Sequence, residues 1–497
     1  MTNMRDTAGL SEELLTGDKQ QLQATFGQNP GTRILVTEYQ AGLLSEGQFD
    51  QAHNCQLERD NGKYKDGQSR MGVKDAIYAL VCTAIGAGVL TLPYALAQSG
   101  LIAGTLILLG IGVLSSYAGE LLVAASKRTG MTSYGTLARA TCGKWAELLT
   151  LACIAITTWL VMGSYMIVMA DMMVPVLEWI FPGITEFAGG YSALRLWIQV
   201  LSLVVVFPYC LRDNMSGFKL IAVLSIVAML ALTAAVVILS IIRIIEKPVQ
   251  WVPPAEPSET VSAVSIKYFS GTSSFLAISI SSVSYLCHFN ILPVVVEEMR
   301  APTKSRSNEA IRWTMVSVAI MYVAFAVFGY LYAYDMPGGV SGDILLNFPS
   351  DSILVNIVRI ALFLTLDLSY PLLVLPCYQS LESLVTELRG YEVGHSRRSF
   401  SSKLWNVAEI LLLCVTSLAC AIAVPHIQVV FAFLGSTVCN IIAFVLPPLF
   451  FVNSRPAGSA LWNRRNASAV LLFALGVFLV ITCTGVQIAI INQLLSK

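Results

Sequence analysis

The sequence predicts an all-α protein that crosses a membrane about eleven times, as an inverted repeat of two five-helix halves with one extra helix. Hydrophobic residues make up 55% of the 497-residue chain and charged residues only 12%, about half the charged fraction of soluble proteins. Eleven apolar runs are long enough to cross a hydrocarbon layer of ~30 Å as helices. The first and the sixth run also carry helix-breaking residues at matching places.

Residues 1–70 precede the first apolar run and hold about seventeen charged side chains. None of these residues forms the apolar segment of a signal peptide, so we expect the chain to begin in the cytoplasm. A composition rich in Gln, Gly, Asp and Glu predicts a disordered cytoplasmic tail that is available to a cytoplasmic partner. Residues 71–497 are predicted to form the transmembrane domain.

The apolar runs are expected to be helices, because an open sheet cannot satisfy its backbone in lipid. They cover residues 73–98, 101–125, 146–171, 192–211, 217–242, 272–296, 313–333, 353–378, 404–424, 427–452 and 468–492. The first repeat would then span 73–244 and the second 272–452, and the helix at 468–492 would be the extra one. An odd number of helices in each repeat makes the two repeats run in opposite directions.

The loops on the side of the tail carry about four times as many Lys and Arg residues as the other loops. This asymmetry predicts a cytoplasmic N-terminus by the positive-inside rule. It leaves open whether the bilayer is the plasma membrane or a lysosomal or vacuolar membrane. The 31 basic and 31 acidic residues balance, so we expect the lipid bilayer and no nucleic acid as a partner.

The first apolar run contains "CTAIGAGVLTLPYALAQSG" at residues 82–100. Gly86 and Gly88 each cost roughly 1 kcal/mol of helix propensity, and Pro93 costs more. Close helix packing is one explanation, because small residues let helix backbones approach each other in membranes. A functional break in the helix is the other.

The sixth apolar run, "SSFLAISISSVSYLCHFNILPVVVEEM", favours the functional explanation. Serine side chains compete for backbone hydrogen bonds and weaken the helix, and Leu292-Pro293 follows them as Leu92-Pro93 follows the glycines. Matched interruptions in the two halves indicate a transporter site near the membrane midplane. Broken helices offer N–H groups to an anion and carbonyls to a cation, and an amino acid carries both charges.

The strings "GAGVLTLPYALAQSG" and "SYLCHFNILPVVVEEMRAPTK" resemble the amino acid/auxin permease family, which includes neutral and proton-coupled amino acid transporters. The resemblance covers about residues 73–490. It implies a LeuT-like fold, first described in a bacterial leucine transporter, and amino acid transport coupled to sodium or protons.

The resemblance also implies a substrate site at the two breaks. The substrate carboxylate would meet the backbone N–H groups of Gly86, Ala87 and Gly88. The carbonyl of Ala84 and the hydroxyl of Thr83 would hold the amine. The opened stretch of the sixth run would line the pocket through Ser281, Ser282 and Ser284. Because no basic side chain lies near either break, a small or neutral amino acid is favoured over an acidic one.

The coupling ion is a proton or sodium, and no other cofactor is expected. The resemblance implies a sodium position at Cys82, Ile85 and Ser369, but Cys82 and Asp367 replace the amide and hydroxyl side chains of many sodium-coupled relatives. An acid at mid-span costs about 2.5 to 3.5 kcal/mol on insertion and indicates a functional group. Asp367 is therefore a candidate proton site, or else a hydrogen-bonded packing residue. His288 either titrates near neutral pH or caps freed backbone.

Two functions are consistent with these features. The first is a secondary amino acid transporter that works by alternating access. The second is a membrane amino acid sensor that uses the same site and signals through its tail. An enzyme is not expected, because the four histidines are scattered and no set of nucleophile, base and acid is apparent.

Overall fold

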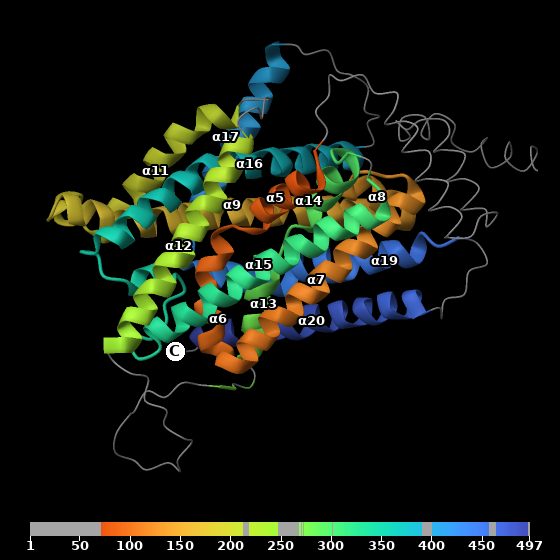
Figure 1. Ribbon diagram of the computed structural model, residues 1–497. Helices are drawn as coiled ribbons and strands as arrows, with labels where there is room; N and C mark the ends of the chain where they lie inside the picture. The colour runs from red at the N-terminus through yellow and green to blue at the C-terminus, as the bar shows by residue number, and fades with distance from the viewer. Residues whose placement is uncertain are drawn as a thin grey trace, which may run out of the picture.

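The computed structural model describes residues 71–211, 218–246, 268–269, 271, 273–300, 302–389, 400–456 and 464–495. Within these ranges the regular elements are helices, joined by turns and loops, apart from an isolated bridge between Met71 and Met299. The predicted disordered tail lies outside the described residues. Figure 1 shows the helices as one bundle, with long segments crossing it at different tilts.

The first half contains α5 (Val73–Ala84), the 3-10 helix η1 (Ala87–Thr91), α6 (Leu92–Ser99), α7 (Leu101–Thr129), α8 (Tyr134–Cys142), α9 (Lys144–Ile180), α10 (Ile184–Phe187), α11 (Tyr191–Cys210) and α12 (Phe218–Glu246). The second half contains α13 (Ser274–Ser284), α14 (His288–Leu292), the π-helix η2 (Pro293–Glu297), α15 (Lys304–Ala333), the 3-10 helix η3 (Ile344–Asn347), α16 (Ile353–Arg389), α17 (Phe400–Ala423), α18 (Ile427–Leu434), the π-helices η4 (Gly435–Cys439) and η5 (Ile441–Val445), and α19 (Leu446–Asn453). The last helix is α20 (Arg464–Leu495).

The number of spans agrees with the prediction. The described residues contain 10 helices that are long and apolar enough to cross a membrane, and 11 when the bent pair at the start counts as one span. The third and eighth spans, α9 and α16, are longer than predicted, with 37 residues each. They pack along each other, whereas the two broken spans pack mainly on α15 and α7.

The first span is broken between α5 and η1. Helix α5 ends because Ile85 and Gly86 take extended backbone conformations, with ψ of 98° and −165°. The axis bends by 52° between the segment Val73–Ala84 and the segment Ala87–Ser99. Pro93 lies in the first turn of α6, where its missing N–H costs nothing. The sequence therefore breaks the helix at Gly86, restarts it as η1 at Ala87 and continues it as α6 from Leu92.

The sixth span is interrupted over fewer residues. Tyr285, Leu286 and Cys287 separate α13 from α14, and the helix resumes at His288. Pro293 then starts the π-helix η2, because a proline cannot donate to the preceding turn. The second break therefore lies where the sequence predicts it, although the segment Ser274–Glu297 still counts as one span.

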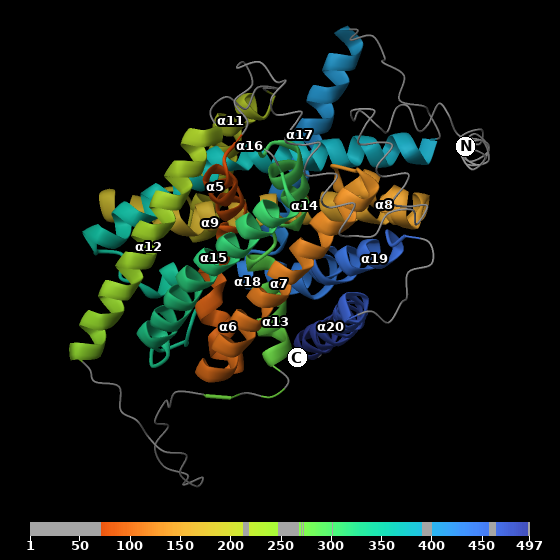
Figure 2. The same cartoon turned by 45° about the vertical axis from the view of Figure 1, so that its right-hand side comes forward.

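The two broken spans cross in opposite directions. The first half of the sixth span, α13, packs against the second half of the first span, α6, while η2 and α14 contact α5. The start of the first span also meets the end of the sixth, because the Met71 N–H donates to the Glu298 carbonyl at 3.0 Å. Both views show α6 beside α13 at one end of the bundle and α5 near α14 at the other (Figures 1 and 2). This arrangement places the two breaks side by side in the interior.

Candidate substrate and coupling site

The backbone at the first break offers unpaired donors. Gly86, Ala87 and Gly88 are the first residues of the helix that restarts after the break. The first N–H groups of a helix have no carbonyl partner within it, and the positive end of the helix dipole lies at the same place. An anion is therefore the natural ligand of this segment.

Two glycines allow close approach at this break. A Cβ atom built on Gly88 would lie 3.0 Å from the Ser284 hydroxyl and 3.3 Å from the Ser284 Cα. A Cβ atom on Gly86 would lie 3.1 Å from the hydroxyl of Tyr165 on α9. The Ser284 hydroxyl donates to the Gly88 carbonyl at 3.2 Å and to the Ile280 carbonyl at 3.0 Å. The first and sixth spans thus touch at Gly88 and Ser284.

The predicted serines of the sixth span are all buried, but their hydroxyls turn mostly toward their own helix. Ser282 donates to the Ile278 carbonyl at 2.9 Å, in the i−4 pattern that loosens a helix. Ser281 lies in the last turn of α13, where its carbonyl accepts from the Tyr285 N–H at 3.2 Å. Ser281, Ser282 and Ser284 therefore lie at the break. The hydroxyls of Ser282 and Ser284 already donate to backbone carbonyls there.

A tyrosine from the seventh span joins the ends of both broken helices. The Tyr322 hydroxyl on α15 lies 2.7 Å from the Ala84 carbonyl, which ends α5, and 2.8 Å from the Ser284 carbonyl, which ends α13. Sequence reasoning missed Tyr322 and Tyr165. A hydroxyl-bearing ring within an apolar span needs a partner when buried, and this was the available signal.

The remaining predicted residues lie on either side of the breaks, with Thr83 in the last turn of α5 and His288 at the start of α14. The Thr83 hydroxyl accepts from the Asn290 amide at 3.4 Å and donates to the Ala79 carbonyl at 3.0 Å. His288 is fully buried, and its Nε2 lies 3.2 Å from the Ser115 carbonyl on α7. Its Nδ1 has no hydrogen-bond partner within the described part of the chain. His288 therefore faces the second span, whereas Thr83 faces the sixth.

The predicted sodium position is a small polar cluster. The Cys82 thiol hydrogen-bonds the Ser225 hydroxyl on α12, and the Ser225 hydroxyl lies 3.5 Å from the Ser369 hydroxyl on α16. Ile85 lies at the break itself, with its N–H bonded to the Val81 carbonyl at 2.8 Å. The cluster therefore joins the first, fifth and eighth spans, and the contribution of the fifth span was not predicted.

Asp367 lies on a different face of α16 from Ser369. Its carboxyl interacts electrostatically with Cys210 on α11, and the residue is only 9% exposed. The Oδ1 atom has no hydrogen-bond partner among the residues that the structure describes. The structure thus separates Asp367 from the cluster of Cys82 and Ser369, in agreement with the opposite helix faces of residues 367 and 369.

A second polar cluster surrounds the loop between α15 and α16. Asp171 on α9 forms an ion pair with Arg195 on α11 at 3.0 Å. Asp343 interacts electrostatically with Asp171, Arg195 and the buried Arg359. The guanidinium of Arg359 donates to the Leu345 carbonyl at 2.8 Å, and η3 in turn packs on η1. This loop therefore covers the first break from the side on which α6 ends.

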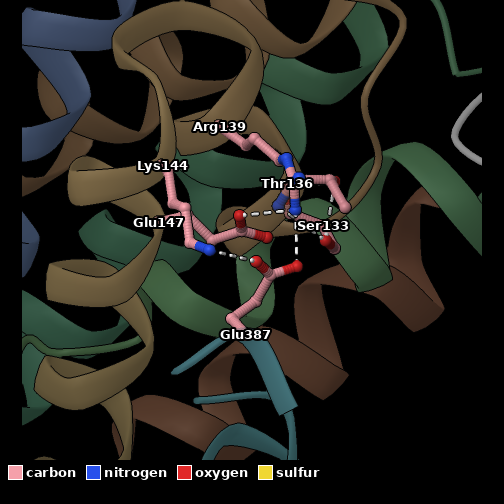
Figure 3. Close-up of polar contacts among 6 residues, drawn as sticks. All are labelled: Ser133, Thr136, Arg139, Lys144, Glu147 and Glu387. Atoms are coloured by element: carbon pink, nitrogen blue, oxygen red, sulfur yellow. Dashed lines mark hydrogen bonds and ion pairs between the residues drawn. The ribbon is translucent and has the colours of Figure 1, made fainter. Parts of the chain in front are cut away.

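A third ionic cluster fixes the loop helix α8 between the second and third spans. Arg139 contacts Glu147 at 3.1 Å and Glu387 at 2.5 Å, and Lys144 contacts Glu387 at 3.6 Å. Figure 3 shows the three elements meeting here, with Ser133 and Thr136 at the start of α8. The cluster holds the ends of α9 and α16 together at the face where the tail is predicted to lie.

Comparison with known proteins defines the family. The family model described as "Transmembrane amino acid transporter protein" matches residues 69–491. The chain belongs to this family of transporters, so it is not an enzyme, and its substrates are amino acids.

Similar proteins include the "Amino acid transporter AVT6E" of Arabidopsis thaliana, which is 26% identical over 433 residues and is matched over 85% of this chain and 84% of its own length. A solved structure, "MhsT in complex with L-phenylalanine", matches 83% of this chain and 100% of that chain at 14% identity, with a TM-score of 0.47.

Proposed function

We propose that this protein is a secondary active transporter of small, neutral amino acids, working by alternating access and coupled to a proton or sodium gradient. The observation that carries the proposal is the meeting of the two breaks, where Gly88 of the first span touches Ser284 of the sixth. Helix ends of both polarities then surround one interior position, which suits a zwitterion.

The substrate carboxylate would bind at the start of η1. The N–H groups of Gly86, Ala87 and Gly88 are donors there, and backbone donors at a helix N-terminus bind carboxylates without a basic side chain. The Tyr165 hydroxyl lies beside Gly86 and would supply a further donor.

The substrate amine would bind at the carbonyl end of the broken first span. The Ala84 carbonyl ends α5, and the Tyr322 hydroxyl occupies only one of its two acceptor positions. Thr83, Ser281 and Ser282 lie along the same two segments and would line the pocket. Residues 82–91 and 279–292 contain no Lys, Arg, Asp or Glu, which favours neutral amino acids over charged ones.

Two positions are candidates for the coupling ion. A sodium ion would bind near Cys82, Ile85 and Ser369, whereas a proton would bind the carboxyl of Asp367. The Oδ1 of Asp367 lacks a hydrogen-bond partner in the described part of the chain, and an unpaired charge at this depth is costly. This favours the proton, with His288 as a neutral buried side chain against α7.

The direct test is uptake and counterflow of labelled amino acids in proteoliposomes, with pH and sodium gradients imposed separately. We expect a neutral amino acid to accumulate under the pH gradient and to exchange against unlabelled substrate. Specific binding without counterflow would instead support the amino acid sensor. The proposal would be overturned if no amino acid in a panel showed either binding or counterflow.

Asp367→Asn and Ser369→Ala distinguish the two coupling ions. If Asp367 binds the proton, Asp367→Asn should remove the pH dependence of uptake, while exchange and substrate binding persist. Ser369→Ala should leave this pH dependence intact. A pH dependence unchanged by Asp367→Asn would reject the role of Asp367, and loss of sodium dependence in Ser369→Ala would support the sodium position.

The proposed orientation places the tail and the ionic cluster of Arg139 in the cytoplasm. The excess of Lys and Arg in the loops on that side supports this direction. Protection of an epitope at residue 1 from protease in sealed cells checks this orientation. Digestion of the tag by external protease would show the opposite orientation.

A further inference from the structure

The Tyr322 hydroxyl lies between two helix ends that both point their carbonyls at it. Its oxygen is 2.7 Å from the Ala84 carbonyl and 2.8 Å from the Ser284 carbonyl. These residues are the last of α5 and α13. Both carbonyls are buried and belong to helices whose next residues leave the helical path.

Carbonyls at two facing helix ends form a site of negative potential. The last carbonyls of a helix lack N–H partners within it, and the negative end of the helix dipole reinforces them. In transporters with discontinuous helices, such ends coordinate sodium ions or protons. A point within hydrogen-bonding distance of both ends would therefore attract a cation if no protein group filled it.

A tyrosine hydroxyl has one proton, so it can serve the two carbonyls only by sharing that proton or alternating between them. It neutralises part of the negative potential without carrying a charge. We propose that the Tyr322 hydroxyl takes the place of a bound cation between the two helix ends, so that transport uses no sodium ion at this position. The inference rests on the proposed function, because it concerns the coupling chemistry of the same site.

The position of Tyr322 is fixed by its neighbours. Its ring packs against that of Tyr285 with centroids 5.2 Å apart, and both rings are fully buried. The Tyr285 hydroxyl has no hydrogen-bond partner within the described residues. Tyr285→Phe is therefore a matched control, since it removes a hydroxyl from an adjacent ring without touching the helix ends.

The first experiment measures the thermal unfolding of the purified full chain in sodium chloride and in N-methyl-D-glucamine chloride at equal ionic strength. A ligand that binds only the folded state raises its melting temperature. We expect Tyr322→Phe to gain a sodium-dependent rise of about 3 °C or more over any rise in the unmodified protein. Tyr285→Phe should respond as the unmodified protein does. The same sodium response in all three proteins would overturn the inference.

The second experiment uses the unmodified protein and so does not depend on the folding of a variant. The ratio of sodium ions to amino acid molecules transported is measured from reversal potentials in proteoliposomes. A ratio of zero or one agrees with a helix-end position filled by Tyr322, because only the Cys82 and Ser369 cluster would remain for sodium. A ratio of two or more would overturn the inference. Absence of amino acid transport would instead contradict the proposed function, while the melting experiment would still report on the helix ends.

Discussion

The two breaks lie side by side, yet the chain makes them in different ways. At the first break, Ile85 and Gly86 are extended and the helix turns by 52° before it restarts. At the sixth, Tyr285 to Cys287 interrupt the helix without a comparable bend. The glycines of the first break allow other spans to approach its backbone. The Ser282 and Ser284 hydroxyls of the sixth bond to their own helix, and Ser284 also reaches the Gly88 carbonyl of the first break.

The difference separates two tasks. The first break exposes donors through glycines that lack side chains, so we propose it as the ligand-facing partner. The sixth break is held in place, by α18 and η4 on one side and by Tyr322 on the other. A substitution at the first break should therefore impair transport, whereas a substitution that disturbs the support of the sixth should impair folding.

Gly435→Ala should have the largest effect, because it acts on the support of the sixth span. An added Cβ would lie 1.9 Å from the Ser279 carbonyl oxygen on α13. Because the clash is between the backbones of two packed helices, neither helix can move aside cheaply. We expect little folded protein, measured as loss of the monodisperse peak in size-exclusion chromatography. Gly485→Ala on α20 is the control, because nothing lies within 4 Å of its added Cβ. A normal yield of Gly435→Ala would remove the distinction between the breaks.

Gly88→Val comes next and acts on the first break. Its side chain would press on Ser284, whose Cα lies 3.3 Å from the Cβ position, and would cover the donors of the restarting helix. We expect uptake to fall by a factor of about 100 or more, equivalent to about 2.7 kcal/mol, while the protein still reaches the membrane.

Gly110→Val on the exposed face of α7 is the control for Gly88→Val, because its added Cβ meets nothing within 4 Å. Surface labelling verifies that both variants reach the membrane. Uptake at the unmodified rate by Gly88→Val would remove the first break from the binding site.

Asp343→Asn tests the cover over the first break. Burial raises the pKa of the Asp343 carboxyl from its usual 3.8 to about 8, with a further contribution from Asp171. A raised pKa in the folded state stabilises the protein fully below the unfolded pKa, and this stabilisation is lost as the pH rises toward the folded value. The melting temperature should therefore fall between about pH 4 and about pH 8, and less steeply in Asp343→Asn. Parallel plots of melting temperature against pH for the two proteins would assign the pH dependence to other groups.

Ser282→Ala should have the smallest effect. Its hydroxyl donates to the Ile278 carbonyl of its own helix, and that carbonyl stays within the helical ladder when the hydroxyl is removed. We expect less than about a twofold change in uptake, since such local bonds contribute little net free energy. A tenfold loss of uptake, measured over a range of substrate concentrations, would instead assign the hydroxyl to substrate binding.

Local sequence was sufficient for several features. The eleven apolar runs predicted the spans, because only helices satisfy the backbone in lipid. Gly86, Gly88 and the serines before Pro293 predicted both breaks, because these residues weaken a helix wherever it lies. The family resemblance placed the site residues near one another, and the structure brings Gly88 and Ser284 into contact.

Contacts between distant segments were not predictable in the same way. Tyr165, Ser225 and Tyr322 look like ordinary residues of apolar spans, and they reach the site only because α9, α12 and α15 pack around the breaks. The same holds for Glu120 on α7, which pairs in the structure with Arg312 on α15, with Nε 2.5 Å from Oε1. Such pairings depend on which helix faces meet.

The sequence by itself determined the membrane class, the number of spans and the places where two of them break, because hydrophobic length and backbone propensity act locally. Only the tertiary structure decided which carbonyls face Tyr322, which hydroxyls join Cys82 and which neighbours surround Asp367. Those choices depend on helix rotation and packing, since a rotation of one residue turns a side chain by about 100° around the helix axis.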